Sequence, residues 1–194
     1  GQHNVSNLLA VAGLLYWYGV ELDDMGAALS NCQPPPGRLQ RVPHPDQTVL
    51  IDFAHTPDAV TQVLLSLRLH CQGRLICVLG CGGDRDPGKR PLMGVAAVQH
   101  SDLCLFTSDN PRSESPASII DEMCRDLAVP LDPADCLIDR KAAIQRALTL
   151  QEPGDVVVIL GKGHERYQEI QGVRYPFNDE AIVTAELMQR GRRA

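Results

Sequence analysis

Short apolar runs alternate with segments of helical periodicity along most of the chain. Three runs rich in Val, Ile and Leu end in Gly or Ser, as buried parallel strands do, and they span residues 74–80, 102–108 and 155–161. Apolar residues that repeat every three to four positions predict helices at residues 58–70, 116–127, 139–150 and 179–190. Strands that alternate with helices predict an α/β fold with a Rossmann-like, doubly wound and mostly parallel sheet.

The first 36 residues follow a different pattern. A long apolar helix is predicted over residues 4–20 and a second helix over 21–32, and three consecutive prolines then break the chain. Two helices cannot enclose a core by themselves. We therefore expect residues 1–36 to be the end of a preceding central domain and residues 37–194 to form a C-terminal domain.

Composition and charge narrow the functional classes. With 44% hydrophobic residues the 194-residue chain can bury a full core, and its net charge of -6 argues against binding to nucleic acid or an anionic membrane. The sequence has no apolar run of the roughly 20 residues that span a bilayer, and no secretory signal, so a cytoplasmic protein is expected. Seven cysteines without a CxxC pair are expected to be reduced thiols rather than metal ligands.

Polar residues follow the ends of four predicted strands, namely the three runs above and a shorter apolar run at residues 49–51, and ligands of parallel sheets bind at such ends. They are Asp52 and His55, then Arg85 and Lys89, then Asp109, Asn110 and Arg112, and finally Lys162, His164 and Glu165. The guanidinium groups of Arg85 and Arg112 suit carboxylates, whereas the carboxylates of Asp109 and Glu165 suit an ammonium group. The set predicts a site for a zwitterion such as an amino acid. For Arg112, the alternative is a surface ion pair with Glu114.

The loop after the strand at 74–80 has almost the spacing of a phosphate-binding P-loop. A P-loop follows its lysine with Ser or Thr, but here the next residue is Arg90. Asp84 and Asp86 would also repel a polyphosphate. A dinucleotide-binding glycine motif fails because Arg85 replaces its last glycine. Both nucleotide classes are therefore disfavoured, and a non-catalytic amino-acid-binding module is the alternative to an enzyme.

Six short motifs occur along the chain in a recognisable order. They are "HNVSN", "GRLQRV", "DFAHTPDA", "GCGGDRDPGKRPLMG", "DNPRSE" and "GKGHERYQ". In this order they resemble the Mur ligases, the amide ligases of peptidoglycan synthesis, and "DNPR" is typical of the branch that adds meso-diaminopimelate. The resemblance implies a three-domain enzyme, in which the first domain binds a uridine nucleotide, the central domain binds ATP and the last brings the amino acid.

On this resemblance, the chain corresponds to the last domain plus the two final helices of the central one. The implied ligands are ATP with Mg²⁺, meso-diaminopimelate and UDP-N-acetylmuramoyl-L-alanyl-D-glutamate. ATP would activate the D-glutamate carboxylate as an acyl phosphate, which an amino group of diaminopimelate attacks. Because the P-loop and the Mg²⁺ ligands belong to the central domain, this chain alone is expected to be inactive.

The resemblance also assigns site residues. The implied diaminopimelate site consists of Arg85, Asp109, Asn110, Pro111, Arg112, Gly161 and Glu165. The implied ATP site consists of Asn4, Asn7, Arg38, Asp52 and His55. No residue is assigned a covalent role, because the domain would act by holding the amine close to the acyl carbon.

Overall fold

The structure is a computed structural model that describes residues 2–32 and 35–191. Its contacts divide the chain into two compact units, Gly1–Pro35 and Pro36–Ala194. No helix in these described ranges is long and apolar enough to cross a membrane.

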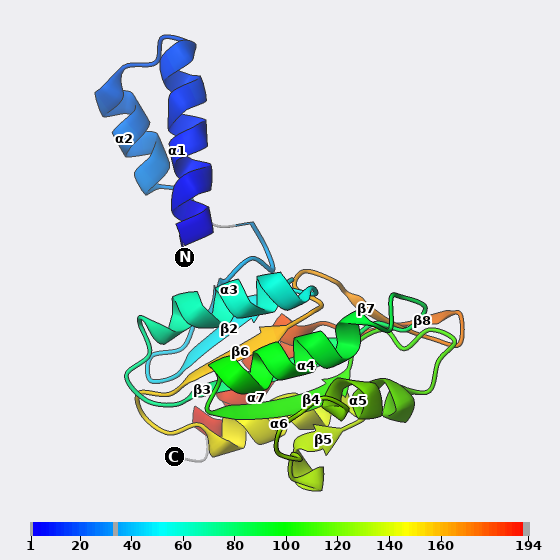
Figure 1. Ribbon diagram of the computed structural model, residues 1–194. Helices are drawn as coiled ribbons and strands as arrows, with labels where there is room; N and C mark the ends of the chain where they lie inside the picture. The colour runs from blue at the N-terminus through cyan, green and yellow to red at the C-terminus, as the bar shows by residue number, and fades with distance from the viewer. Residues whose placement is uncertain (1, 33–34, 192–194) are drawn as a thin grey trace. The chain divides into compact units, whose positions relative to one another are not determined.

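The first unit is a pair of helices, α1 (Gln2–Trp17) and α2 (Leu22–Ser30), which pack against each other (Figure 1). The turn between them contains Gly19, whose φ of +82° lies in the region that favours glycine. Met25 of α2 is buried, whereas many apolar side chains of α1 are exposed, including Trp17. Two helices of this size leave much apolar surface uncovered.

The second unit is built on a six-stranded sheet of order β1-β2-β6-β3-β4-β5. The strands are β1 (Gln40–Val42), β2 (Thr48–Asp52), β3 (Leu75–Cys81), β4 (Leu103–Ser108), β5 (Cys136–Leu137) and β6 (Val156–Leu160). Neighbouring strands are parallel except β1 and β2, which are antiparallel. This confirms the predicted α/β fold with a doubly wound, mostly parallel sheet.

Helices cover both faces of this sheet (Figure 1). One face carries α3 (Pro57–Arg68), α4 (Lys89–His100) and α5 (Pro116–Cys124). The other carries α6 (Arg140–Leu150) and α7 (Asp179–Gly191). The four predicted helices are confirmed, although α3 and α5 end earlier than predicted. After α3, the amide of His70 donates to the carbonyl of Leu67, so the chain tightens into a turn.

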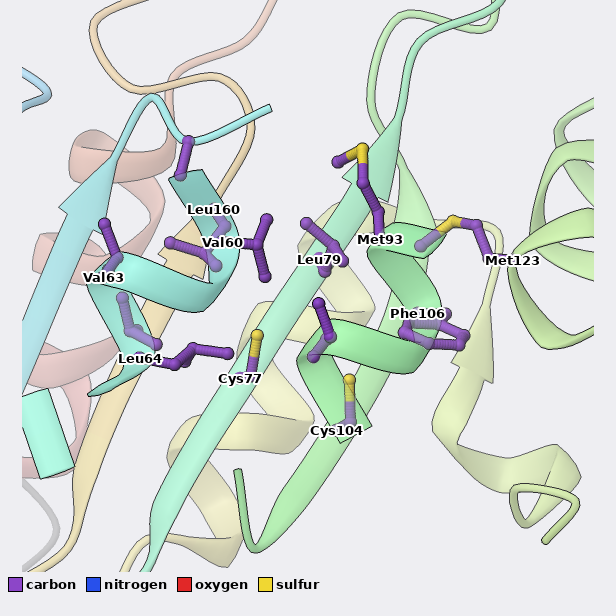
Figure 2. Packing of buried hydrophobic residues seen from close by; sticks show 14 of the residues in the cluster. Val60, Val63, Leu64, Cys77, Leu79, Met93, Cys104, Phe106, Met123 and Leu160 are labelled. Carbon is purple, nitrogen blue, oxygen red and sulfur yellow. The ribbon is translucent and has the colours of Figure 1, made fainter. Parts of the chain in front are cut away.

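The core lies on both faces of β3, the central strand. Cys77 and Leu79 belong to the cluster under α3, α4 and α5 (Figure 2). Ile76 and Val78 belong to the opposite cluster, with side chains of α6 and α7. All residues of β3 are buried, as expected for a strand that helices cover on both sides.

Several short elements are absent from the sequence-based prediction. They are the edge strands β1 and β5, the 3₁₀ helix η1 (Pro133–Asp135), and a hairpin of β7 (Tyr167–Ile170) and β8 (Val173–Pro176). β8 is exposed throughout, so it carries no apolar periodicity to detect. All seven cysteines are free thiols.

Candidate functional site

The carboxyl ends of β2, β6, β3 and β4 lie along one edge of the sheet, because these strands are parallel neighbours. A cavity of about 320 Å³ lies beside these ends. The predicted residues that line it are His55, Arg85, Lys89, Asp109, Asn110, Arg112, Gly161 and Glu165. Pro111 is buried and does not line the cavity. The structure thus brings six of the seven residues assigned to diaminopimelate around one space, and their ligand stays a prediction.

Residues 109–112 form the turn after β4. Asp109 and Asn110 are buried, and Arg112 has a left-handed backbone with a φ of +50°. Nη1 of Arg112 donates to the carbonyl oxygen of Gly83 at 2.6 Å. The amide of Gly83 donates to the carbonyl oxygen of Asn110 at 2.8 Å. These two bonds join the turn after β4 to the loop after β3.

The β7–β8 hairpin holds the same turn from another direction. The backbone amide of Arg112 donates to the carbonyl of Glu169 at 3.0 Å, and its carbonyl accepts from the amide of Gln171 at 2.7 Å. Nε2 of Gln168 donates to the carbonyl of Asp109 at 2.7 Å. The hairpin therefore fixes the left-handed backbone that aims the Arg112 side chain.

A buried lysine joins the polar residues after β4 and β6. The Lys162 side chain is fully buried, and its Nζ lies 2.9 Å from Oδ1 of Asn110 and 3.0 Å from Oε2 of Glu165. It also lies 3.5 Å from Oδ1 of Asp109. Burial raises the pKa of the Asp109 carboxyl, against the lowering effect of Arg140 and Lys162. The sequence predicts that Lys162 lies at this strand end, but it does not predict what the side chain binds.

A second buried charge pair lies next to these strand ends. Arg140, at the start of α6, binds Asp179, at the start of α7, through two nitrogens at 2.9 and 2.7 Å. Its Nη2 also donates to the carbonyl of Leu160 at 3.0 Å, and its Nη1 to that of Ser108 at 3.4 Å. Burial alone would lower the pKa of Arg140, but the Asp179 carboxylate raises it above its ordinary value. The pair ties α6 and α7 to the ends of β4 and β6, and no local sequence signal indicated it.

The alternative predicted for Arg112, a surface ion pair with Glu114, is wrong, because Arg90 binds that glutamate. The Arg90 side chain is 2% exposed and binds both oxygens of Glu114, while Nη1 also donates to Glu122 at 2.9 Å. Its Nη2 donates to the carbonyl of Gly82 at 3.2 Å. Glu114 is therefore the partner of Arg90, not of Arg112. In the sequence alone, Arg90 is notable only because it occupies the position where a P-loop has Ser or Thr.

Cys81, the last residue of β3, lines the cavity next to the charged groups. It is 5% exposed, and burial raises the pKa of its thiol to about 12. At neutral pH it therefore remains a thiol, which is a poor nucleophile.

Asp52 ends β2 and is 4% exposed. Its Oδ2 accepts the amide of Leu39 at 2.8 Å, and its Oδ1 accepts the amide of Ala54 at 2.8 Å. The carboxylate therefore organises the turns on both sides of the strand. Each oxygen keeps a further lone pair that can accept another hydrogen bond.

The other residues assigned to the nucleotide are split between the two units. The guanidinium of exposed Arg38 lies 5.0 Å from the ring centroid of Phe53, and the ring of His55 lies 4.6 Å from the same centroid. Asn7 is exposed on α1 of the first unit, and the side chain of Asn4 lies outside the described residues. Their assignment to ATP stays a prediction.

Comparisons with known proteins agree on one family. Residues 37–163 match the model of the Mur ligase glutamate ligase domain. A UDP-N-acetylmuramoyl-L-alanyl-D-glutamate--2,6-diaminopimelate ligase of Chromobacterium violaceum is 46% identical over 198 residues, covering 100% of this chain. The ligase of the same name from Xylella fastidiosa strain Temecula1 is 48% identical over 185 residues, covering 94% of this chain and 37% of that protein.

Solved structures give the same result. A structure of a UDP-N-acetylmuramoyl-L-alanyl-D-glutamate--2,6-diaminopimelate ligase superposes with a TM-score of 0.75 at 39% identity, covering 98% of this chain and 39% of that one. A UDP-N-acetylmuramate-alanine ligase of Thermotoga maritima shares the fold, with a TM-score of 0.70 at 18% identity. The chain spans 39% of the length of the Chromobacterium relative. By its family-model match, the chain belongs to the Mur ligase family, and residues 37–163 carry the glutamate ligase domain of that family.

Proposed function

We propose that this chain is the amino-acid-binding part of an ATP-dependent ligase that adds meso-diaminopimelate to UDP-N-acetylmuramoyl-L-alanyl-D-glutamate. The observation that carries the proposal is the cavity at the carboxyl ends of the strands, where guanidinium groups and carboxylates converge. Relatives at 46% and 48% identity bear the name of this ligase. We propose the cytoplasm as its location, because the reaction consumes ATP.

The charges around the cavity suit an amino acid with two zwitterionic ends. Arg85 and Arg112 each offer a planar set of donors that matches a carboxylate. Glu165 and Asp109 offer acceptors for an ammonium group. Meso-diaminopimelate carries a carboxylate and an amine at each end, so one end can occupy this cavity while the other amine points toward the reaction centre.

The chain's proposed contribution to the chemistry is positional. The amine that attacks must be close to the acyl carbon of the activated D-glutamate, and holding two reactants in place can lower a barrier by about 7–11 kcal/mol. The Arg112 side chain is well suited to this, because backbone bonds to Glu169 and Gln171 fix its orientation. We assign no residue of the chain a covalent role.

ATP with Mg²⁺ would supply the phosphoryl group that activates the D-glutamate carboxylate. Arg38 and His55 flank the ring of Phe53 and suit the ribose or phosphate side of a nucleotide. Within the described part of the chain, no cluster of three or more His, Cys, Asp or Glu could hold a metal ion.

We also propose that residues 1–36 are the last helices of a central ATP-binding domain. The division of contacts between Pro35 and Pro36 supports a boundary there. Exposed apolar side chains on α1, including Leu9, Tyr16 and Trp17, support burial against further protein.

The proposal is tested with the full-length protein, ATP, Mg²⁺ and the UDP-linked dipeptide. We expect meso-diaminopimelate to be joined to the dipeptide with release of phosphate, as measured by mass spectrometry of the product. L-Lysine in its place should react much less. Binding of diaminopimelate without ligation by the full-length protein would favour a non-catalytic binding module instead. The chain of 194 residues alone should form no product.

A further inference from the structure

Lys162 stands out among the charged residues near the cavity, because nothing in the proposed function uses it. Its side chain is fully buried, although lysine is among the residues least often buried without a partner. We infer that Lys162 is a positioning residue of the amino-acid site: it holds Glu165 and Asn110 so that one oxygen of Glu165 is presented to the ammonium group of the substrate. The inference rests on the proposed function and deepens it.

The contacts of Lys162 match its bonding capacity. An ammonium group has three donors and no acceptor. Its Nζ has three acceptors within reach, namely Asn110 at 2.9 Å, Glu165 at 3.0 Å and Asp109 at 3.5 Å. Because a buried charge is costly unless it is paired and hydrogen-bonded, this geometry fixes the three partners as much as it fixes the lysine.

The two oxygens of Glu165 are used unequally. Oε2 accepts from Nζ of Lys162 at 3.0 Å and from Nδ2 of Asn110 at 2.8 Å. Oε1 accepts no hydrogen bond from the described residues. The Glu165 side chain is 22% exposed and lines the cavity. The free oxygen is therefore available to a donor in the cavity, and a charged donor such as an ammonium group binds a carboxylate more strongly than a neutral donor does.

Asn110 is oriented by the same arrangement. Its Oδ1 accepts from Nζ of Lys162 and from the backbone amide of Glu169 at 3.0 Å. Two donors on the oxygen leave the nitrogen to face Glu165. Removing Lys162 would leave the Glu165 side chain bonded to Asn110 alone, and the Asn110 side chain bonded to Glu165 and to the amide of Glu169.

Carboxylates outnumber cations in the buried group around Lys162. Near Lys162 lie Asp109 and Glu165, and Arg140 of α6 and Asp179 of α7 act on Asp109. Within this buried group three carboxylates thus face two cations, whereas Arg85, Lys89 and Arg112 line the cavity outside the group. Other charged or titratable groups come from four further elements. The loop and helix after β3 carry Arg85, Asp86 and Lys89, and the turn after β4 carries Arg112. His55 lines the cavity from the turn after β2, and Arg174 of β8 stacks on Tyr167.

A purely structural role for Lys162 makes a different prediction. If the lysine only neutralised the buried Asp109, its removal would lower stability and affect all substrates alike. If it positions Glu165, its removal should act on diaminopimelate specifically and should leave the other two substrates almost unaffected.

The experiment compares wild type with Lys162→Met and Lys162→Arg in the full-length enzyme. For wild type, ligation of diaminopimelate tests the proposed function independently of the lysine. For Lys162→Met we expect the KM for diaminopimelate to rise about tenfold or more, while the KM values for ATP and the UDP-linked dipeptide change less than about twofold. Lys141→Met, at an exposed lysine of α6, is the matched control and should behave as wild type.

Lys162→Arg keeps the charge but changes the geometry. It should raise the KM for diaminopimelate, because a guanidinium places its donors differently from an ammonium group, while the KM values for ATP and the UDP-linked dipeptide stay close to those of wild type. This variant decides the question if Lys162→Met does not fold. Equal changes in the KM of all three substrates, or an unchanged KM for diaminopimelate in either folded variant, would overturn the inference. A wild-type enzyme that ligates no diaminopimelate would overturn the proposed function itself.

Discussion

Arg90 binds both carboxylate oxygens of Glu114, with each terminal nitrogen 2.7 Å from one oxygen. The pair joins α4 to the segment after β4, and Glu114 also accepts the backbone amide of Asp84. The Arg90–Glu114 ion pair therefore connects the loop that carries Arg85 to the turn that carries Arg112, although it contacts neither of these two arginines. We expect this pair to help keep the side chains of Arg85 and Arg112 at the same cavity.

The Arg90–Glu114 pair should make stability depend on acid pH. The hydrogen bond from Arg90 is the largest cause that lowers the pKa of Glu114, from 4.5 to about 2. A lowered carboxyl pKa contributes stability that is complete above the unfolded pKa and is lost as pH falls from 4.5 toward 2. We expect Glu114→Gln to unfold at a lower temperature than wild type at pH 7, and the difference to shrink below pH 4.5.

Thermal unfolding of both proteins across this pH range measures the effect. Glu152→Gln is the control, because the Glu152 side chain is 75% exposed and lies 3.5 Å from Arg74. It should change the unfolding temperature little at any pH. A difference between wild type and Glu114→Gln that is the same at pH 7 and pH 3 would contradict this account.

Gly83 is the point where the two loops approach most closely. A Cβ at this position would collide with the carbonyl oxygen of Pro111. We expect Gly83→Ala to push the loops apart, to cost roughly 1–3 kcal/mol of stability and to raise the KM for diaminopimelate. Gly88→Ala is the matched control, because its nearest contact is the flexible side chain of Asp86 at 3.2 Å. If both alanine variants behave alike in unfolding and kinetics, the close approach is unimportant.

Much of the fold could be predicted from local patterns of apolar residues, whereas the buried charged contacts that support the site could not. The central strands are apolar runs, and the helix over 58–70 shows its buried face in the sequence. Because parallel strands end at one edge, the polar residues after them could be brought together without a structure. By contrast, Arg140 and Asp179 are 39 residues apart, and each looks like an ordinary residue at a helix start. Lys162 likewise meets Asp109 and Asn110 only because β4 and β6 end on the same edge of the sheet.

The Arg140–Asp179 pair should be costly to break from one side. Both side chains are fully buried, so Arg140→Met leaves an unpaired carboxylate and should cost about 3–5 kcal/mol. Replacing both residues, as in Arg140→Met with Asp179→Leu, should cost clearly less than the two single changes added together. A double-mutant cycle of unfolding free energies measures this coupling. Strictly additive effects would show that the pair acts as two independent residues.

Asp52 should affect ATP more than the amino acid. Asp52→Ala removes both the acceptors for Leu39 and Ala54 and the proposed ribose contact. Loss of a charged hydrogen-bond partner costs about 1.5–3 kcal/mol, so we expect the KM for ATP to rise roughly tenfold or more with a smaller effect on diaminopimelate. Asp52→Asn, which keeps one acceptor oxygen, should be intermediate. Steady-state kinetics with each substrate varied in turn measure these effects. A larger rise in the KM for diaminopimelate than in the KM for ATP would place Asp52 in the amino-acid site.

Arg112 should decide between diaminopimelate and lysine. Its Nη1 is bound to the carbonyl of Gly83, whereas its Nε and Nη2 make no hydrogen bond within the described residues, so one edge of the guanidinium is free for a carboxylate. Diaminopimelate has a carboxylate beside its second amine and lysine has none there. Arg112→Ala should therefore cost about 2–5 kcal/mol in kcat/KM for diaminopimelate, and much less for lysine. Arg125→Ala, at an exposed arginine near the end of α5, should change neither value. Equal losses for both amino acids would mean that Arg112 shapes the turn after β4 without reading the second carboxylate.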